Sequence, residues 1–222
     1  MFTHYAKAEV KTVVAVTVLS AAAIVFACLW QNWLWGLMLL VGPVGLGILG
    51  LQFFRDPDRQ VPDGENRVVS PADGVVMDVK DGLEHPFVGR ARRLGIFMSL
   101  FNVHVNRVPV GGEVAHTLYR PGEFLRANLE EASERNESYE VGLKTRWGKV
   151  LVRQVAGIVA RRIVCEAKKG QNLKRGERYG MVKYGSRLEV WVEERARFRW
   201  CVKVGDRTRA GETVIGEFLD EA

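Results

Sequence analysis

The chain of 222 residues contains a nucleophile, a base and a carboxylate whose types and contexts could support catalysis. The Ser186 hydroxyl follows Gly185, which has no Cβ and so can adopt the backbone needed for attack on its own carbonyl. His104 lies among valines, where an imidazole is costly to bury unless it is paired or reactive. Asp73 precedes a glycine in a predicted turn. When each residue is considered alone, an ordinary turn is enough to explain Asp73 and the Gly-Ser pair. His104 alone is explained by a core histidine whose ring nitrogens are hydrogen-bonded.

Three polar residues flank His104 and are candidates for substrate binding. Asn102, Asn106 and Arg107 place two amides and a guanidinium within six residues of an otherwise apolar run. Such groups need partners if they are buried. The other histidines, His4, His85 and His116, are interpreted as structural, with His85 in a loop.

The cysteine pattern predicts no metal site and no disulfide framework. The three cysteines are far apart, and no Cys-x-x-Cys spacing or Cys/His cluster accompanies them. We expect three reduced thiols in a reducing compartment.

Residues 1–54 are predicted to form a helical membrane hairpin. Positions 12–30 and 33–54 lack charged side chains, and each run as a helix spans roughly the 30 Å hydrocarbon core of a bilayer. Gln31 and Asn32 form the polar break between the runs. Two full spans are favoured over a hairpin that dips into one leaflet. Four glycines of the second run are expected to let the helices approach closely: Gly42, Gly45, Gly47 and Gly50.

The charge distribution favours a lipid partner over nucleic acid. The formal net charge is +6, and nearly all charged side chains follow residue 54. Basic residues lie at the two outer ends of the hairpin, before the first apolar run and after the second. We therefore expect both ends, and the catalytic part that follows, on the cytoplasmic side of the cell membrane. Three more arginines either face anionic headgroups or form a solvated basic face: Arg90, Arg92 and Arg93.

Residues 55–222 are predicted to form a mainly β catalytic domain with few short helices. Apolar and polar residues alternate in short runs such as 74–79, 93–98, 149–155 and 187–192. Only Glu123–Ser133 has a helical pattern. The segment 169–180 resembles 204–216, with paired glycines around a Gly-Glu step. That repeat is similar to the turns of biotinyl- and lipoyl-type barrel-sandwich domains, although Met181 and Lys183 make a poor carrier site.

Seven motifs in order resemble the short-chain branch of the phosphatidylserine decarboxylase proenzymes. The resemblance runs from about residue 53 to the C-terminus and rests on the following residues: Phe53-Phe54-Arg55-Asp56-Pro57, Ser70-Pro71-Ala72-Asp73-Gly74, Phe101-Asn102-Val103-His104-Val105-Asn106-Arg107, Pro121-Gly122-Glu123-Phe124, Asn136-Glu137, Gln154-Val155-Ala156-Gly157 with Ala160-Arg161-Arg162-Ile163, and Tyr184-Gly185-Ser186-Arg187. The better-known long branch has Leu-Gly-Ser-Thr around the serine and a second histidine at the position of Arg107. Roles of that second histidine do not transfer.

The resemblance implies a self-processing, pyruvoyl-dependent enzyme. Ser186 would attack the Gly185 carbonyl, the chain would be cut between these residues, and Ser186 would become a covalent pyruvoyl cofactor. His104 would act as the base, with Asp73 orienting its ring. The pyruvoyl group would then serve as the electron sink while phosphatidylserine loses CO2 and becomes phosphatidylethanolamine. The two fragments are expected to stay together as a heterodimer within a further homo-oligomer.

Two alternatives remain open at this point. An archaetidylserine decarboxylase would act on the same headgroup with different lipid tails. A membrane-tethered barrel-sandwich module would bind or carry without catalysis. Only the enzyme hypotheses predict a C-terminal fragment 186–222 of about 4 kDa, in proportion to its share of the 25.0 kDa chain.

Overall fold

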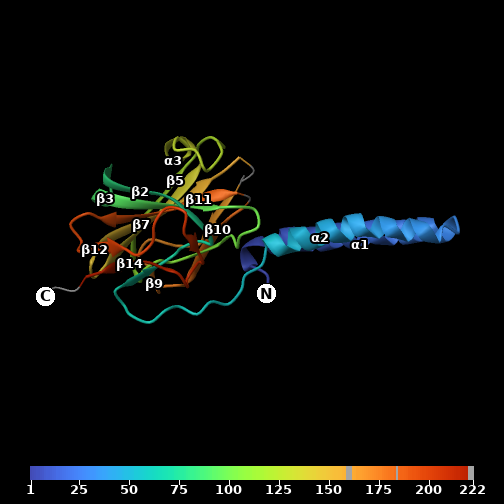
Figure 1. The fold of residues 1–222 in the computed structure, drawn as a ribbon, viewed down its shortest axis with the longest axis horizontal. Helices are drawn as coiled ribbons and strands as arrows, with labels where there is room; N and C mark the ends of the chain where they lie inside the picture. The colour runs from blue at the N-terminus through green and yellow to red at the C-terminus, as the bar shows by residue number, and fades with distance from the viewer. Residues whose placement is uncertain (159–161, 184, 220–222) are drawn as a thin grey trace. The chain divides into compact units, whose positions relative to one another are not determined.

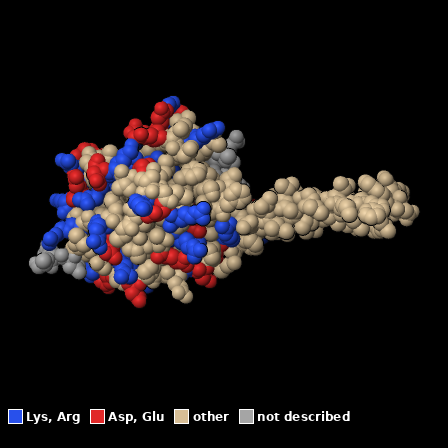
Figure 2. Space-filling view, in the orientation of Figure 1, with Lys and Arg blue, Asp and Glu red and all other residues tan. Residues whose placement is uncertain are grey.

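The computed structural model describes residues 1–158, 162–183 and 185–219. Two compact units make up the chain, Met1–Pro57 and Asp58–Ala222 (Figure 1). The first is helical and the second is built mainly of strands. In Figure 2, lysine, arginine and acidic side chains are spread over the second unit, whereas the visible face of the helical rod carries none. This division lies three residues after the boundary expected from the sequence.

The unit 1–57 contains two long apolar helical segments. A short 3-10 helix η1 (His4–Ala6) leads into α1 (Lys7–Trp30), and the second segment joins a 3-10 helix η2 (Leu34–Leu40) to α2 (Val41–Phe53). The break falls at the predicted position, where Asn32 takes a positive φ of 52°. By length and composition, 4–30 and 34–53 are each able to cross a bilayer.

Close approach of α1 and α2 depends on some of the predicted glycines. A Cβ on Gly47 would lie 2.4 Å from Thr17 Oγ1, and one on Gly50 would lie 3.2 Å from Val13. Nothing lies within 4 Å of a Cβ placed on Gly42 or Gly45. The packing role predicted for those two glycines is therefore wrong, because their side of α2 does not meet α1.

The unit 58–222 confirms the mainly β prediction. Its largest sheet has the strand order β13-β2-β3-β11-β7-β6-β5-β9, with every neighbouring pair antiparallel, and it curls as Figure 1 shows. Two three-stranded sheets, β1-β14-β12 and β4-β10-β8, complete it. The strands are β1 (Arg67–Val69), β2 (Gly74–His85), β3 (Gly89–Met98), β4 (Val105–Arg107), β5 (Gly112–Arg120), β6 (Ser138–Thr145), β7 (Gly148–Ala156), β8 (Ile163–Cys165), β9 (Asn172–Leu173), β10 (Arg178–Val182), β11 (Ser186–Glu193), β12 (Phe198–Trp200), β13 (Arg207–Thr208) and β14 (Val214–Phe218).

The helix predicted over Glu123–Ser133 is wrong, because only α3 (Ala132–Arg135) is helical there. Partners distant in sequence satisfy the backbone of this segment instead of a helical ladder. The Glu123 N–H donates to the carbonyl of Arg135, and the Leu125 N–H donates to Asn136 Oδ1. The amphipathic pattern therefore belongs to a looped segment that is pinned at Asn136.

The repeat seen in the sequence is a structural repeat, as expected for a barrel-sandwich-like fold. The Gly176 N–H donates to Val108 O, and the Val108 N–H donates to Glu177 O, both at 2.8 Å. The equivalent turn uses Gly211 with Ser70 O and Ser70 with Thr213 O, again at 2.8 Å. A second matched pair of turns joins 170–171 to Val114 and 205–206 to Val76. Both copies therefore hold the segments from which Asp73 and His104 emerge.

Candidate active site

Ser186 is the first residue of the central strand β11. It pairs with Met98 at the end of β3 and with Ala156 at the end of β7. Its side chain is fully buried, and its Oγ has no hydrogen-bond partner among the described residues. A buried hydroxyl without a partner is costly and points to a functional requirement.

The backbone before Ser186 is shaped by two glycines. Gly185 takes a positive φ of 59°, a left-handed conformation that disfavours residues with a Cβ. A Cβ on Gly157 would lie 2.1 Å from the carbonyl oxygen of Gly185 and 3.2 Å from the Cβ of Ala127. Glycine at 157 therefore leaves the space that this carbonyl occupies, a contact that the sequence alone did not reveal.

His104 is fully buried, and a backbone carbonyl orients its ring. Its Nδ1 lies 2.9 Å from the carbonyl oxygen of Asn102. Because a carbonyl only accepts, Nδ1 carries the proton of the neutral ring and Nε2 is the nitrogen able to take one. Asn102 is itself held by Ser99, whose N–H and hydroxyl donate to Asn102 Oδ1 at 2.9 and 2.8 Å.

The strand after His104 lies against the end of β3 that pairs with Ser186. Asn106 contacts Met98 Sδ at 3.9 Å, and Met98 is directly opposite Ser186. Asn106 Oδ1 also accepts from Gln154 Nε2 at 2.7 Å. The Asn106 amide thus makes a hydrogen bond within the protein. The local sequence could not predict this bond, because Gln154 is 48 residues away.

Asp73 reaches the same end of β3 but is held by other partners. The turn that carries it abuts the strand, since a Cβ on Gly74 would lie 2.3 Å from Phe97 O. The buried Asp73 carboxylate accepts from Arg59 Nη2 at 2.9 and 3.1 Å and from the Ala210 N–H at 2.8 Å. Its orienting role toward His104 stays a prediction. Arg59 is a partner that sequence reasoning missed, because its turn-rich context gave no sign of it.

Arg107 serves a structural function in the site region. Its N–H donates to the carbonyl of Pro71 at 2.9 Å, and its Nη1 donates to Gly176 O at 3.0 Å. It thereby ties the Asp73 turn to one copy of the repeat. Substrate contacts for Asn102, Asn106 and Arg107 stay predictions.

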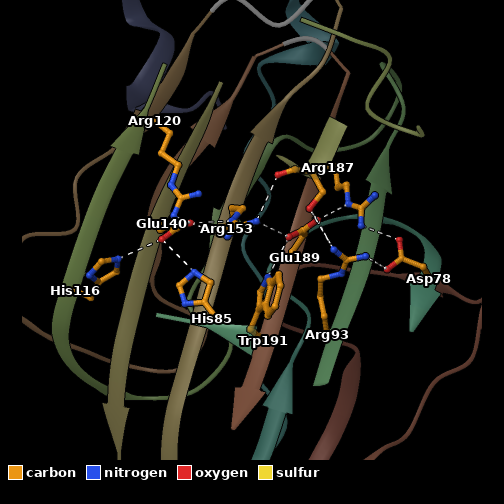
Figure 3. Close-up of polar contacts among 11 residues, drawn as sticks. Asp78, His85, Arg93, His116, Arg120, Glu140, Arg153, Arg187, Glu189 and Trp191 are labelled. Carbon is orange, nitrogen blue, oxygen red and sulfur yellow. Dashed lines mark hydrogen bonds and ion pairs between the residues drawn. The ribbon is translucent and has the colours of Figure 1, made fainter. Parts of the chain in front are cut away.

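The opposite face of β11 holds a buried ionic network (Figure 3). Arg187 points away from the Ser186 face and binds Asp78 Oδ2 and Glu189 Oε1, each at 2.8 Å. Glu189 also accepts from the hydroxyl of Ser133 at 2.6 Å, which connects the sheet to α3. Burial raises the pKa of Glu189, but the charges of three arginines outweigh it and the net pKa is lowered: Arg187, Arg93 and Arg153.

Glu140 on β6 is the second acidic centre of this network. Burial raises its pKa, but hydrogen bonds and charges from its neighbours lower it to about 2. These neighbours are His85 at 3.4 Å, His116 at 3.2 Å and Arg153 at 2.8 Å. Both histidines therefore have the structural surroundings expected for them, although His85 is the last residue of β2 and not in a loop.

The network corrects one expectation about lipid-facing arginines. Arg93 is buried and paired with Asp78 at 3.1 Å, so it does not face headgroups. Arg92 donates to Phe198 O at 2.8 Å, and Arg90 pairs with Glu194. The expected solvated basic face is therefore wrong at Arg93, where Ser133 of α3 packs against the strand and accepts from Arg93 Nη1 at 3.2 Å.

Comparison with known proteins decides the family. The family model described as phosphatidylserine decarboxylase matches residues 46–216. The chain belongs to the phosphatidylserine decarboxylase family. It is 42% identical over 218 residues to a phosphatidylserine decarboxylase proenzyme of Chlorobium phaeobacteroides, covering 97% of this chain and 99% of the relative. A proenzyme of the same name from Geotalea uraniireducens is 48% identical over 165 residues, which cover 74% of this chain and 76% of that one.

Membership of this family confirms the resemblance found in the sequence and makes the chain a decarboxylase. A third similar protein, the phosphatidylserine decarboxylase proenzyme of Syntrophus aciditrophicus, is 42% identical over 85% of this chain and 86% of its own length. Three motif positions lie outside the described residues: Ala160, Arg161 and Tyr184.

Proposed function

We propose that this chain decarboxylates phosphatidylserine after cutting itself between Gly185 and Ser186. The observation that carries the proposal is the fully buried Ser186 hydroxyl, which has no partner in the described part of the chain and follows a left-handed glycine. The chain also aligns along nearly its whole length with a phosphatidylserine decarboxylase proenzyme, and this similarity supports the same conclusion.

The first step would convert a peptide bond into an ester. Ser186 Oγ attacks the carbonyl carbon of Gly185, the C–N bond breaks, and the proton of the hydroxyl passes to the freed nitrogen of residue 186. His104 Nε2 is our candidate for moving this proton, since Nδ1 is already committed to Asn102 O. Met98 and Ala156, which pair with Ser186, both belong to the buried apolar core, and this burial would limit competition from water in the first step.

The second step would release the front fragment. Removal of the α-proton of residue 186 expels the Gly185 carboxylate as the Cβ–Oγ bond breaks. The resulting enamine rearranges to an imine, and water replaces its nitrogen as ammonia. Gly185 becomes the C-terminus of one fragment, and a pyruvoyl group becomes the N-terminus of the other.

Once formed, the pyruvoyl group would supply an electron-withdrawing carbonyl for the amino group of the substrate, which is the electron sink that loss of CO2 requires. The residues around Ser186 fit such a group, because β3 and β7 hold position 186 at the end of a buried strand. His104 is our candidate for returning a proton to the α-carbon of the lipid headgroup. Asp73, held by Arg59 and Ala210, would provide negative charge near this histidine.

We further propose that residues 1–57 anchor the enzyme in the cell membrane with the catalytic unit on its cytoplasmic side. Two apolar helical segments joined at Asn32 and basic residues at both outer ends support this arrangement. The two fragments would remain together, since β11 keeps its hydrogen bonds to β3 and β7 after the cut. A further homo-oligomer remains part of the proposal.

The test is turnover of phosphatidylserine vesicles by the full chain, with a matched pair of buried-serine variants. Wild type and Ser138→Ala are expected to release CO2 and phosphatidylethanolamine, and Ser186→Ala is expected to do neither. Ser138 is also buried and lies in the same sheet, so it controls for the loss of a hydroxyl. Turnover by Ser186→Ala would overturn the proposal.

The same assay separates the alternatives. Turnover of archaetidylserine but not of diacyl phosphatidylserine would favour an archaetidylserine decarboxylase. A chain that binds vesicles without releasing CO2 would favour a non-catalytic module.

A further inference from the structure

Three loops meet at the end of the sheet where Ser186 lies. β3 ends at Met98 and β7 ends at Ala156, and both residues pair with Ser186, so 99–102 and 157–158 leave the sheet beside it. The segment 121–131 is tied to the same end. Asn136 Nδ2 donates to Ala156 O at 2.7 Å and to Leu125 O at 2.8 Å. The three loops therefore lie at the end of the sheet where the proposed chemistry occurs.

These loops carry an unusual concentration of exposed apolar side chains. Five of the ten large apolar side chains exposed in the described part of 58–222 lie on them. Phe101 is 75% exposed and Ile158 is 58% exposed. Soluble surfaces rarely group such side chains unless the patch binds something. We call these five residues the apolar rim: Leu100, Phe101, Phe124, Leu129 and Ile158.

Two exposed arginines accompany the apolar rim. Arg126 lies between Phe124 and Leu129 in sequence, and Arg162 lies shortly after Ile158. Within the ranges that the structure describes, neither guanidinium makes a hydrogen bond or ion pair. Nearby Arg135, in contrast, binds Glu123 at 2.8 Å. Exposed apolar side chains together with cations that lack carboxylate partners are the combination that binds an anionic membrane interface.

We infer that the apolar rim, with Arg126 and Arg162, docks on the surface of a bilayer that contains anionic phospholipid. The inference rests on the proposed function and deepens it, because it assigns the membrane contact to loops of the catalytic unit itself. The substrate headgroup lies at the bilayer surface, and the loops that carry the apolar rim lie at the Ser186 end of the sheet. Insertion of the rim therefore brings the headgroup to the reacting residue without extracting the lipid.

The first experiment compares bilayer and monomeric substrate with the full chain. Phe101→Ser/Phe124→Ser is expected to lower turnover of phosphatidylserine in mixed phosphatidylserine–phosphatidylcholine vesicles at least tenfold. Turnover of monomeric dihexanoyl phosphatidylserine and self-cleavage should be unchanged. Leu219→Ser is the matched control: Leu219 is also exposed, but its N–H donates to Arg197 O beyond the far end of β11. Equal losses on both substrates, or no loss on vesicles, would overturn the inference.

Charge is tested separately from apolar contact. Arg126→Gln and Arg162→Gln are each expected to weaken the preference for anionic over neutral vesicles about fivefold. The effect should shrink as salt is added. An unchanged preference in both variants would remove the arginines from the docking surface.

A second measurement does not depend on activity. A fluorophore on Phe101→Cys, in a Cys165→Ser/Cys201→Ser background, should be quenched by nitroxide-labelled lipids in vesicles that hold the full chain. The same label on Leu219→Cys should not be quenched. Equal quenching at both positions would contradict the inference. A label at position 101 that is shielded in native membranes but not quenched in pure lipid vesicles would also contradict it, because a protein partner would then cover the rim. If the wild type neither cleaves itself nor turns over either substrate, the proposed function fails, and quenching alone decides the docking surface.

Discussion

Ser186 and Arg187 are neighbours in β11, but their side chains enter opposite surroundings. On the Ser186 face, Leu188, Val190 and Val192 pack into the main apolar core. On the Arg187 face, Glu189 and its arginine partners form a buried ionic network. Both faces are buried, so the alternation that predicted a strand does not mark a boundary between core and solvent here.

The difference assigns separate tasks to the two faces. The apolar face continues the Ser186 side of the strand with Leu188, Val190 and Val192, which carry no charge and pack into the core. The ionic face fixes the strand through directional contacts at Asp78 and Glu189. Under the proposed cut, β11 loses its covalent link at residue 185, and the contacts of Arg187 are the first side-chain contacts that remain.

The largest effect is expected on the Ser186 side, from Gly157→Ala. Its Cβ would meet the Gly185 carbonyl oxygen at 2.1 Å, so the carbonyl must move away from its position before Ser186. We expect self-cleavage to be lost, with only full-length chain visible by denaturing electrophoresis. Gly111→Ala is the matched control, because the nearest atom to its Cβ is at 3.4 Å, and it should be processed normally. Normal cleavage of Gly157→Ala would show that this carbonyl is not held as described.

On the ionic side, Arg187→Met is expected to lower stability without preventing cleavage. Removing one partner of a buried ion pair costs about 3–5 kcal/mol, and Arg93 and Arg153 remain to pair with Glu189. Urea unfolding followed by tryptophan fluorescence measures the loss, and Arg187→Lys should recover part of it. Leu188→Ala on the other face should cost about 2–5 kcal/mol through a cavity. A variant of Arg187 that is as stable as wild type would contradict the role given to the network.

The two faces of β11 should also differ in how their contributions to stability depend on pH. The pKa of Glu140 falls from an ordinary 4.5 to about 2 in the folded chain, so its stabilisation is fully present above pH 4.5 and is lost as pH falls through 2. The shift corresponds to on the order of 3 kcal/mol. Wild type should therefore lose more stability between pH 5 and pH 2 than Glu140→Gln does. The cost of Leu188→Ala should be the same across that range. Identical acid sensitivity of wild type and Glu140→Gln would contradict the assignment.

The smallest effect is expected where the ionic contacts reach solvent. Arg135 and Glu123 form an exposed pair at 2.8 Å, which raises the pKa of Arg135 through hydrogen bonding and charge. Water and salt screen such pairs. Arg135→Ala should unfold at the same urea concentration as wild type. A clear loss would mean that the loop before α3 contributes more to the network than its exposure indicates.

Sequence alone was sufficient for the parts of the molecule that local pattern controls. The uncharged runs predicted both helical segments, and alternation predicted the strands that flank Ser186. The resemblance also led to the family. The Gly-Glu repeat predicted the paired turns, because each turn depends on residues within a few positions of one another.

The remaining features depend on contacts between distant residues. Arg59 binds Asp73, and Gln154 binds Asn106 across 48 residues, with no local signal for either pair. Glu123–Ser133 has a helical pattern, but long-range bonds to Asn136 and Arg135 override it. The sequence suggests that Arg93 is a surface cation. Only the pairing of β3 with β11 shows that it is buried against Glu189.

If the chain processes itself as proposed, Ser186 becomes the pyruvoyl N-terminus of a separate fragment. Intact-mass measurement of the purified, active enzyme, expressed from the full chain, decides this. We expect a fragment covering 186–222 of about 4 kDa, with a carbonyl-blocked N-terminus that reacts with hydroxylamine, beside a larger fragment that ends at Gly185. An active preparation that contains only the uncut chain, or a small fragment that begins with an unmodified serine, would contradict it.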